Sequence, residues 1–154
     1  MRLTWISVVA VLGAVACGGG EKQAQQTETP AAGAPAAAPA AGGPVVEVKM
    51  TGNGSTMAAF TPATLTIAPG TTVRFTNVSG GPHNIAFYGD SIPAGAAAVL
   101  NAGMANRMDN LSGPFLTQPN ETYDVSFAGA AKGSYKGYCL PHVALGMKIT
   151  ITVQ

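Results

Sequence analysis

The sequence predicts an all-β protein folded as a β-sandwich, with one short helix or loop insertion. From Val45 onward, short segments alternate apolar and polar residues, which is the period of a strand with one buried face. Glycine and proline pairs such as Pro69-Gly70 separate these segments. Only one stretch places apolar residues at helical spacing. Several short strands within about 110 residues are typical of a sandwich.

Each predicted strand has one apolar face. In the first strand, Val46, Val48 and Met50 share one face, and charged residues occupy the other. The same alternation predicts strands over residues 64–67, 72–76, 123–127, 133–139 and 148–153. Because Pro69-Gly70 lies between residues 64–67 and 72–76, those two strands are predicted to form a hairpin.

One apolar stripe has helical spacing, and it consists of Leu100, Met104, Met108 and Leu111. The stripe lies between two prolines, and Gly103 disfavours a long helix. We expect a short helix or an irregular loop here. Methionines at helical spacing are more often core residues than metal ligands, so we interpret this pair as core filler.

The chain is predicted to have three parts. Residues 1–16 contain a charged start and an apolar run, which is typical of a signal peptide, and Ala14-Val15-Ala16 before Cys17 resembles a bacterial lipobox. Lipid attached to Cys17 would anchor the mature chain. Residues 17–44 are rich in Ala, Pro and Gly and are predicted to form a disordered tether. Residues 45–154 are expected to fold as one domain.

The overall charge limits the range of partners. The chain has 8 Lys and Arg residues against 7 Asp and Glu residues, and no basic cluster. Nucleic acid is therefore not an expected partner. The apolar run before Cys17 is shorter than the roughly 20 residues that span a bilayer, so a lipid anchor is the only membrane attachment that we expect. We expect an exported monomer at the periplasmic or other extracytoplasmic face.

Four side chains predict a copper site. The chain has 2 histidines, His83 and His142, and the second lies in the pattern Cys-x2-His-x4-Met from Cys139 to Met147. A soft thiolate, two imidazoles and a weak thioether suit copper in both of its oxidation states. The alternation of residues 133–139 turns the Cys139 side chain inward. These donors predict a type 1 copper site.

Other functions remain open on the residues alone. Copper storage or delivery in the cell envelope would use the same donors without redox cycling. A copper enzyme needs further histidine-rich centres, and both histidines are already assigned to one site. Zinc would accept a cysteine and two histidines, but it has no preference for methionine as fourth ligand. This set of four donors agrees best with an electron carrier, which is not an enzyme.

The domain resembles plastocyanin-type cupredoxins, which are blue copper proteins. The resemblance rests on five segments, namely 69–77, His83-Asn84, 90–95, Glu121-Thr122-Tyr123 and 135–147. It implies a Greek-key β-sandwich with one copper ion near one end. It also implies that His83, Cys139 and His142 bind the ion and that Met147 is a distant axial ligand.

The resemblance further implies how electrons move. The ring edge of His142 would be the main port, and Tyr138 lies where plant-type members have a second route. Partners would be redox proteins that dock near His142, for example a cytochrome c, a quinol-oxidising complex, a terminal oxidase or a photosynthetic reaction centre. Leu140 replaces a small hydroxyl residue, which puts loop support by Asn84 in doubt. Pro141 has no amide hydrogen to donate to the sulfur, which predicts an altered potential.

Overall fold

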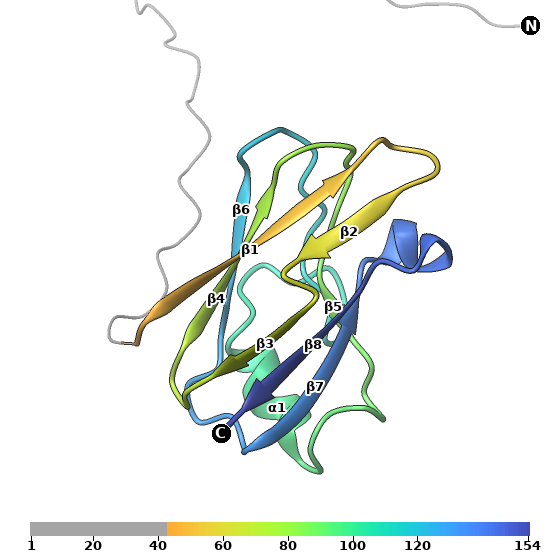
Figure 1. The fold of residues 1–154 in the computed structure, drawn as a ribbon. Coiled ribbons are helices and arrows are strands. Elements are labelled where there is room, and N and C mark those ends of the chain that lie inside the picture. The colour runs from red at the N-terminus through yellow and green to blue at the C-terminus, as the bar shows by residue number, and fades with distance from the viewer. Residues whose placement is uncertain (1–42) are drawn as a thin grey trace, which may run out of the picture. The chain divides into compact units, whose positions relative to one another are not determined.

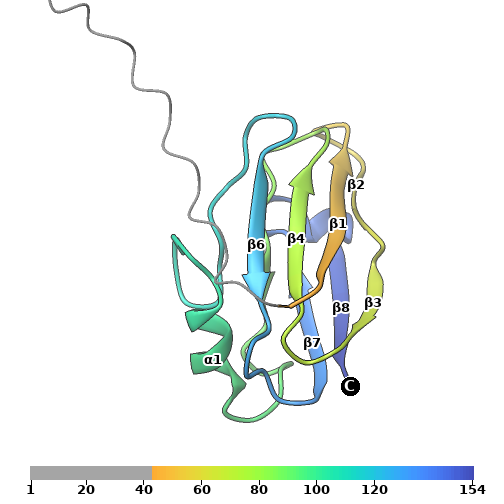
Figure 2. The ribbon, with the colours of Figure 1, turned by 90° about the vertical axis from the view of Figure 1, so that its left-hand side faces the viewer.

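Two four-stranded sheets pack face to face in residues 43–154, the part of the chain that the computed structural model describes (Figure 1). The first sheet contains, in spatial order, β2 (Ala58–Thr61), β1 (Val45–Gly52), β4 (Thr72–Asn77) and β6 (Thr122–Ser126). The second contains β3 (Thr64–Ile67), β8 (Lys148–Val153), β7 (Gly133–Tyr138) and β5 (Ala86–Phe87). Figure 2 shows β6, β4 and β1 in front of β7 and β8, so the two layers enclose the core.

The order of the strands confirms the predicted sandwich but not the predicted hairpin. β3 pairs in parallel with β8, whereas β4 pairs in parallel with β1 and antiparallel with β6. The strands on either side of Pro69-Gly70 therefore lie in different sheets. Gly70 has φ 84°, and its N–H donates to the carbonyl of Phe127. This bond directs the chain across to the other sheet, which alternation alone cannot reveal.

The core lies between the sheets and uses the predicted inward faces. Val48, Phe75, Tyr135 and Ile151 are all 0% exposed, and each comes from a different strand. Burial of an aliphatic or aromatic side chain of this size contributes about 1.5–3 kcal/mol. The outward neighbours on β1 and β8 are polar, so each strand has one buried and one solvated face.

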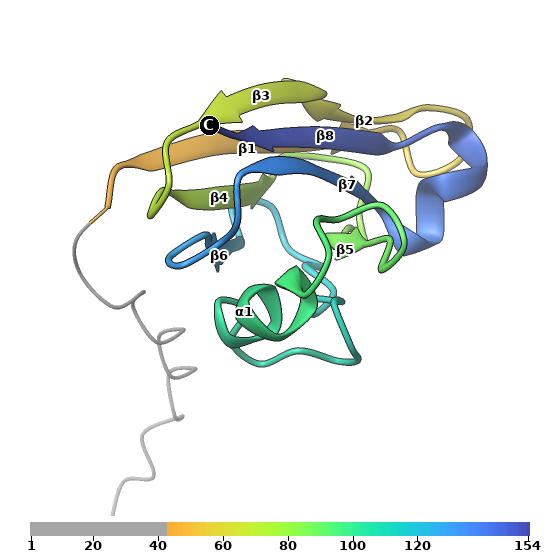
Figure 3. The same cartoon turned by 90° about the horizontal axis from the view of Figure 1, so that it is seen from below.

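The insertion is a short helix followed by a loop. The sequence predicted either a short helix or an irregular loop, and the structure contains one of each. α1 spans Ala96–Ala102. Figure 3 shows it on the side of β5 and β6, away from the C-terminus in that view. Gly103 follows the helix and lies close to β6. A Cβ at this position would lie 2.0 Å from the carbonyl oxygen of Ser126, so the close approach requires glycine. Met104 is buried as predicted, but Met108 is 48% exposed, so its assignment to the core is wrong.

The N-terminal predictions lie outside the described residues. These are the signal peptide of residues 1–16, the lipid attached to Cys17, and the tether up to residue 42. Among residues 43–154, no helix is long and apolar enough to cross a membrane.

Candidate metal centre

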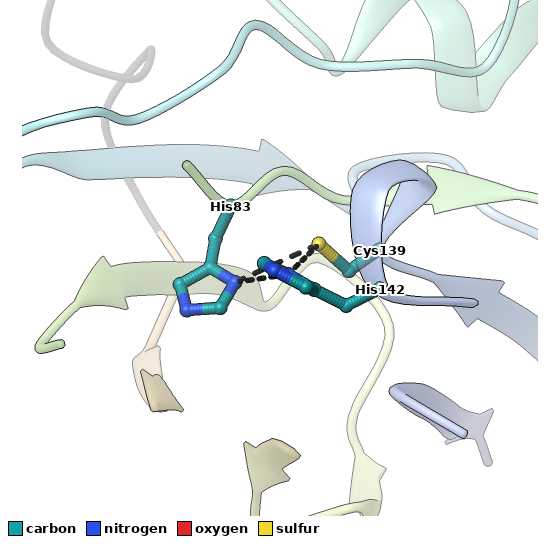
Figure 4. A group of neighbouring side chains, drawn as sticks. All are labelled: His83, Cys139 and His142. Carbon is teal, nitrogen blue, oxygen red and sulfur yellow. Dashed lines mark hydrogen bonds between the residues drawn. The ribbon is translucent and has the colours of Figure 1, made fainter. Parts of the chain in front are cut away.

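Three elements bring the predicted donors together. His83 follows β4 and forms an isolated antiparallel bridge with Leu116. Cys139 directly follows β7, where Tyr135 and Gly137 are buried on the inward face, so its thiol also points inward. His142 lies in the 3₁₀ helix η1 (Leu140–Leu145), which begins directly after Cys139. The three side chains meet in Figure 4.

The three donor atoms form a small triangle. The Nδ1 atoms of His83 and His142 lie 3.1 Å apart, and the Cys139 Sγ lies 3.7 Å from the first and 3.5 Å from the second. A point equidistant from three atoms with these separations lies about 2 Å from each. Metal–imidazole bonds in proteins have lengths of ~2.0–2.1 Å. A single ion of that size therefore fits between these donors.

Hydrogen bonding and burial prepare His83 for metal binding. Its Nε2 lies 2.9 Å from the carbonyl oxygen of Ser79, so Nε2 carries the hydrogen and donates it. That tautomer leaves the Nδ1 lone pair free to face the other donors. Burial lowers the pKa of His83, which favours the neutral imidazole that binds metals.

The Cys139 sulfur lies in a dry environment. The residue is 0% exposed, and burial raises the pKa of its thiol. The backbone N–H of Asn84 lies 3.5 Å from Sγ and acts in the opposite direction, because it stabilises the thiolate. A metal cation would bind the thiolate directly and displace the proton.

Asn84 connects the loops around the metal centre. The sequence had put this role in doubt, because Leu140 replaces a small hydroxyl residue. Its Oδ1 accepts a hydrogen bond of 2.8 Å from the Leu140 backbone N–H. Its Nδ2 lies 3.3 Å from both the Ser112 hydroxyl and the Gly113 carbonyl oxygen. The bond to Leu140 uses the main chain, so the loss of a hydroxyl side chain at that position does not remove it.

The loop from Cys139 to Met147 is closed by its own backbone. The Cys139 N–H donates to the Met147 carbonyl over 3.1 Å, and the Met147 N–H donates to the His142 carbonyl over 3.2 Å. Gly146 takes the left-handed conformation, with φ 82°, that ends η1. Met147 is 0% exposed and directly precedes β8. The loop is therefore short and fixed at both ends.

The His142 ring lies near the surface among apolar side chains. His142 is 7% exposed, whereas His83 is fully buried. Its neighbours in η1 are open to solvent, with Leu140 46% and Leu145 39% exposed. Pro141 is also exposed, on the same short helix. An apolar rim, defined here as residues 140–145, thus borders the one ligand candidate that reaches the surface.

Tyr138 has a neighbour that the sequence did not reveal. Its ring is half-buried and stacks on Tyr88, with centroids 4.4 Å apart and planes at 29°. Tyr88 follows β5, which pairs with β7. The sequence separation of fifty residues hides this contact. Ser79 and Ser112 were also not predicted: the Ser79 carbonyl oxygen accepts a hydrogen bond from the His83 ring, and the Ser112 hydroxyl accepts one from Asn84.

A family model described as "Copper binding proteins, plastocyanin/azurin family" matches residues 46–154. The chain belongs to this family. It is 37% identical over 109 residues to plastocyanin of Rumex obtusifolius, a match that covers 71% of this chain and 100% of the relative. It is 45% identical over 95 residues to the chloroplastic plastocyanin of Chlamydomonas reinhardtii, which covers 62% of this chain and 58% of that protein.

Solved structures agree with the family. The oxidized plastocyanin of Dryopteris crassirhizoma has a TM-score of 0.53 and 31% sequence identity, covering 71% of this chain and 100% of the other. These matches confirm the plastocyanin-type resemblance and the Greek-key sandwich. They also confirm copper as the cofactor, and the cluster of His83, Cys139 and His142 agrees with a single ion.

Proposed function

We propose that this protein is a blue-copper carrier that moves single electrons between redox partners at the cell envelope. One observation carries the proposal, namely the triangle of His83 Nδ1, His142 Nδ1 and Cys139 Sγ with sides of 3.1–3.7 Å in a buried site. When bound, copper would supply the Cu(II)/Cu(I) redox couple, whose two states differ by one electron. The plastocyanin relatives support electron transfer and not catalysis of a chemical conversion.

We assign four ligands in this proposal. His83, Cys139 and His142 would form the strong set, and Met147 would be the weak axial ligand. Soft sulfur and imidazole donors satisfy both copper oxidation states, so neither state requires a different ligand set. The Asn84 bond to Leu140 and the closed backbone of the ligand loop would hold the donors in place during the change.

The apolar rim around His142 is the proposed docking site for a partner. Leu140 and Leu145 are exposed large apolar residues beside a ligand candidate. A partner that covers them removes apolar surface from water and buries no charged group. Candidate partners are a cytochrome c, a quinol-oxidising complex, a terminal oxidase or a photosynthetic reaction centre. Electrons would enter or leave through the His142 ring edge.

The attachment to the envelope is also part of the proposal. Residues 1–16 would direct export, and Cys17 would carry lipid after cleavage. A flexible tether of residues 17–44 would span roughly 30 Å, enough for the domain to reorient between partners. Replacing Cys17 by Ser in the full chain should move the protein from the membrane fraction to the soluble extracytoplasmic fraction. Unchanged fractionation would refute the anchor.

A spectroscopic titration tests the electron carrier. Addition of Cu(II) to the purified chain should give an intense visible thiolate-to-copper band at one equivalent. Stepwise reduction should bleach the band, and reoxidation should restore it without loss of metal. A colourless complex, or copper released on reduction, would favour storage or delivery and refute the electron carrier.

A further inference from the structure

The loop between β1 and β2, residues 53–57, contains an exposed asparagine–glycine pair. Both Asn53 and Gly54 are open to solvent. Gly54 has φ 78°, and an ideal Cβ placed there would meet no heavy atom within 4 Å beyond its chain neighbours. The Gly54 backbone N–H donates no hydrogen bond to any described residue. The nitrogen of this peptide unit is therefore accessible and unoccupied.

The side-chain amide of Asn53 is held by the same loop. Its Oδ1 accepts hydrogen bonds from three backbone N–H groups, those of Ser55 at 3.2 Å, Thr56 at 2.9 Å and Met57 at 3.0 Å. These bonds draw electron density from Cγ. They would also stabilise the negative charge that Oδ1 gains when a nucleophile adds to Cγ. The Asn53 carbonyl carbon is therefore polarised towards attack.

We propose that Asn53 is a site of spontaneous deamidation in the folded protein. The attack is intramolecular, because the nucleophile belongs to the next residue. The Gly54 nitrogen loses its proton to solvent and bonds to Asn53 Cγ, the Cγ–Nδ2 bond breaks, and the leaving nitrogen takes a proton from solvent to depart as ammonia. Water then opens the cyclic imide at either carbonyl. The sum is gain of water and loss of ammonia, with an aspartyl or an isoaspartyl residue at position 53.

The other asparagines are less suited to this reaction. The chain has a single Asn-Gly pair, and glycine hinders its own nitrogen least because it lacks a Cβ. Asn106 and Asn120 are exposed, but each precedes a residue with a long side chain. Asn77 and Asn84 are 2% and 1% exposed, and their amides are bonded to neighbouring loops. Deamidation is therefore expected first in the 53–57 loop.

The two products affect the loop differently. The aspartyl product keeps Oδ1 and gains a negative charge, so it accepts the same three N–H bonds more strongly. In the isoaspartyl product the main chain passes through Cβ and Cγ, which lengthens it by one carbon and removes the side-chain acceptor. We expect the aspartyl product to preserve the loop and the isoaspartyl product to open it.

The loop also borders a segment that supports a ligand candidate. Gly52, which precedes Asn53, is joined to the Ser79 hydroxyl by hydrogen bonds of 3.4 and 3.2 Å. The Ser79 carbonyl oxygen in turn accepts from His83 Nε2. Deamidation therefore places a new negative charge, and in one product a longer main chain, beside the residues that position His83.

Peptide mapping of the aged full chain tests the site. Trypsin cleaves after lysine and arginine, so residues 50–74 form one peptide whose sole asparagine is Asn53 and which contains no glutamine. Incubation at mildly alkaline pH should raise the mass of this peptide by one dalton before residues 75–107 or 108–132 change, which hold the other asparagines. An isoaspartyl methyltransferase should label the same peptide, and a fresh sample digested in parallel gives the background. No gain in residues 50–74, or an earlier gain in another peptide, would overturn the proposal.

Two matched variants confirm the reacting residue. Asn53→Gln lengthens the side chain by one CH2 group, so attack by the Gly54 nitrogen no longer closes a five-membered ring. The gain in residues 50–74 should disappear. Asn106→Gln makes the same change at another exposed asparagine and should leave that gain as in the parent. A gain that persists in Asn53→Gln, or disappears in both variants, would refute the assignment. The measurement needs no copper, so it is independent of the proposed electron-carrier function.

Urea unfolding distinguishes the two products. Ion exchange separates the aged protein from the parent by its additional negative charge. The variant Asn53→Asp carries that charge without a lengthened main chain, so it should unfold at a urea concentration no lower than the parent. The aged fraction, which includes the isoaspartyl product, should unfold at a lower concentration. Equal midpoints for the aged fraction and Asn53→Asp would refute the opening of the loop.

Discussion

Replacement of Asn84 by alanine should strongly destabilise the metal-free domain. The side chain is 1% exposed and makes hydrogen bonds to Leu140, Ser112 and Gly113. A typical hydrogen bond contributes about 0.5–1.5 kcal/mol net, and three such bonds contribute about 3 kcal/mol. For a domain of this size, that loss lowers Tm by about 12 °C. Part of the loss comes from leaving the Ser112 and Gly113 polar atoms without this partner.

Urea unfolding of the metal-free chain, followed by circular dichroism, measures this effect without the contribution of bound copper. The midpoint should fall while the slope with denaturant stays constant, which indicates a change in stability alone. The exposed amide Gln154 provides a matched control, and Gln154→Ala should change stability by less than about 0.5 kcal/mol. A loss below about 1 kcal/mol in Asn84→Ala would refute the view that this side chain holds the loops together.

Three further substitutions test other parts of the structure. Cys139→Ser should abolish the intense visible band of the copper complex, because oxygen is too hard a donor to replace the sulfur; a persistent band means that the ligand is misassigned. Pro141→Ala adds an amide hydrogen next to the sulfur and should raise the midpoint potential in voltammetry, whereas an unchanged potential contradicts the argument. Gly113→Ala places a Cβ 2.5 Å from the Tyr123 ring and should lower the free energy of unfolding in urea by about 1–3 kcal/mol. In the control Gly89→Ala, the new Cβ lies 3.7 Å from its nearest neighbour, and stability should hardly change. Equal losses of stability in the two variants would refute the clash.

Residue alternation predicted the buried faces well because each face is a local property of its strand. Val48, Tyr135 and Ile151 are all buried as expected. The partner of a strand is not local, and this is why the predicted hairpin around Pro69-Gly70 is wrong. A turn sequence indicates a change of direction, but it does not say whether the next strand joins the same sheet.

The donor cluster was visible in the sequence because Cys139, His142 and Met147 lie within one short segment. The residues that hold the donors in place were harder to predict. Asn84 accepts a hydrogen bond from the Leu140 main chain, and a main-chain bond does not depend on which residue is present. The Tyr88–Tyr138 stack depends on the pairing of β5 with β7, which no local pattern determines.

The placement of β8 has a consequence for when the protein matures. β8 is the last strand of the chain, yet it lies inside its sheet between β3 and β7. β3 has no other strand partner within the described residues, so its edge stays unpaired until Lys148–Val153 has been synthesised. The ligand loop is held between β7 and β8, and its second end has no strand to hold it before then. The second end of the ligand loop can therefore be fixed only after residues 148–153 have been synthesised and paired, so binding of a metal to the fully positioned donors follows that pairing.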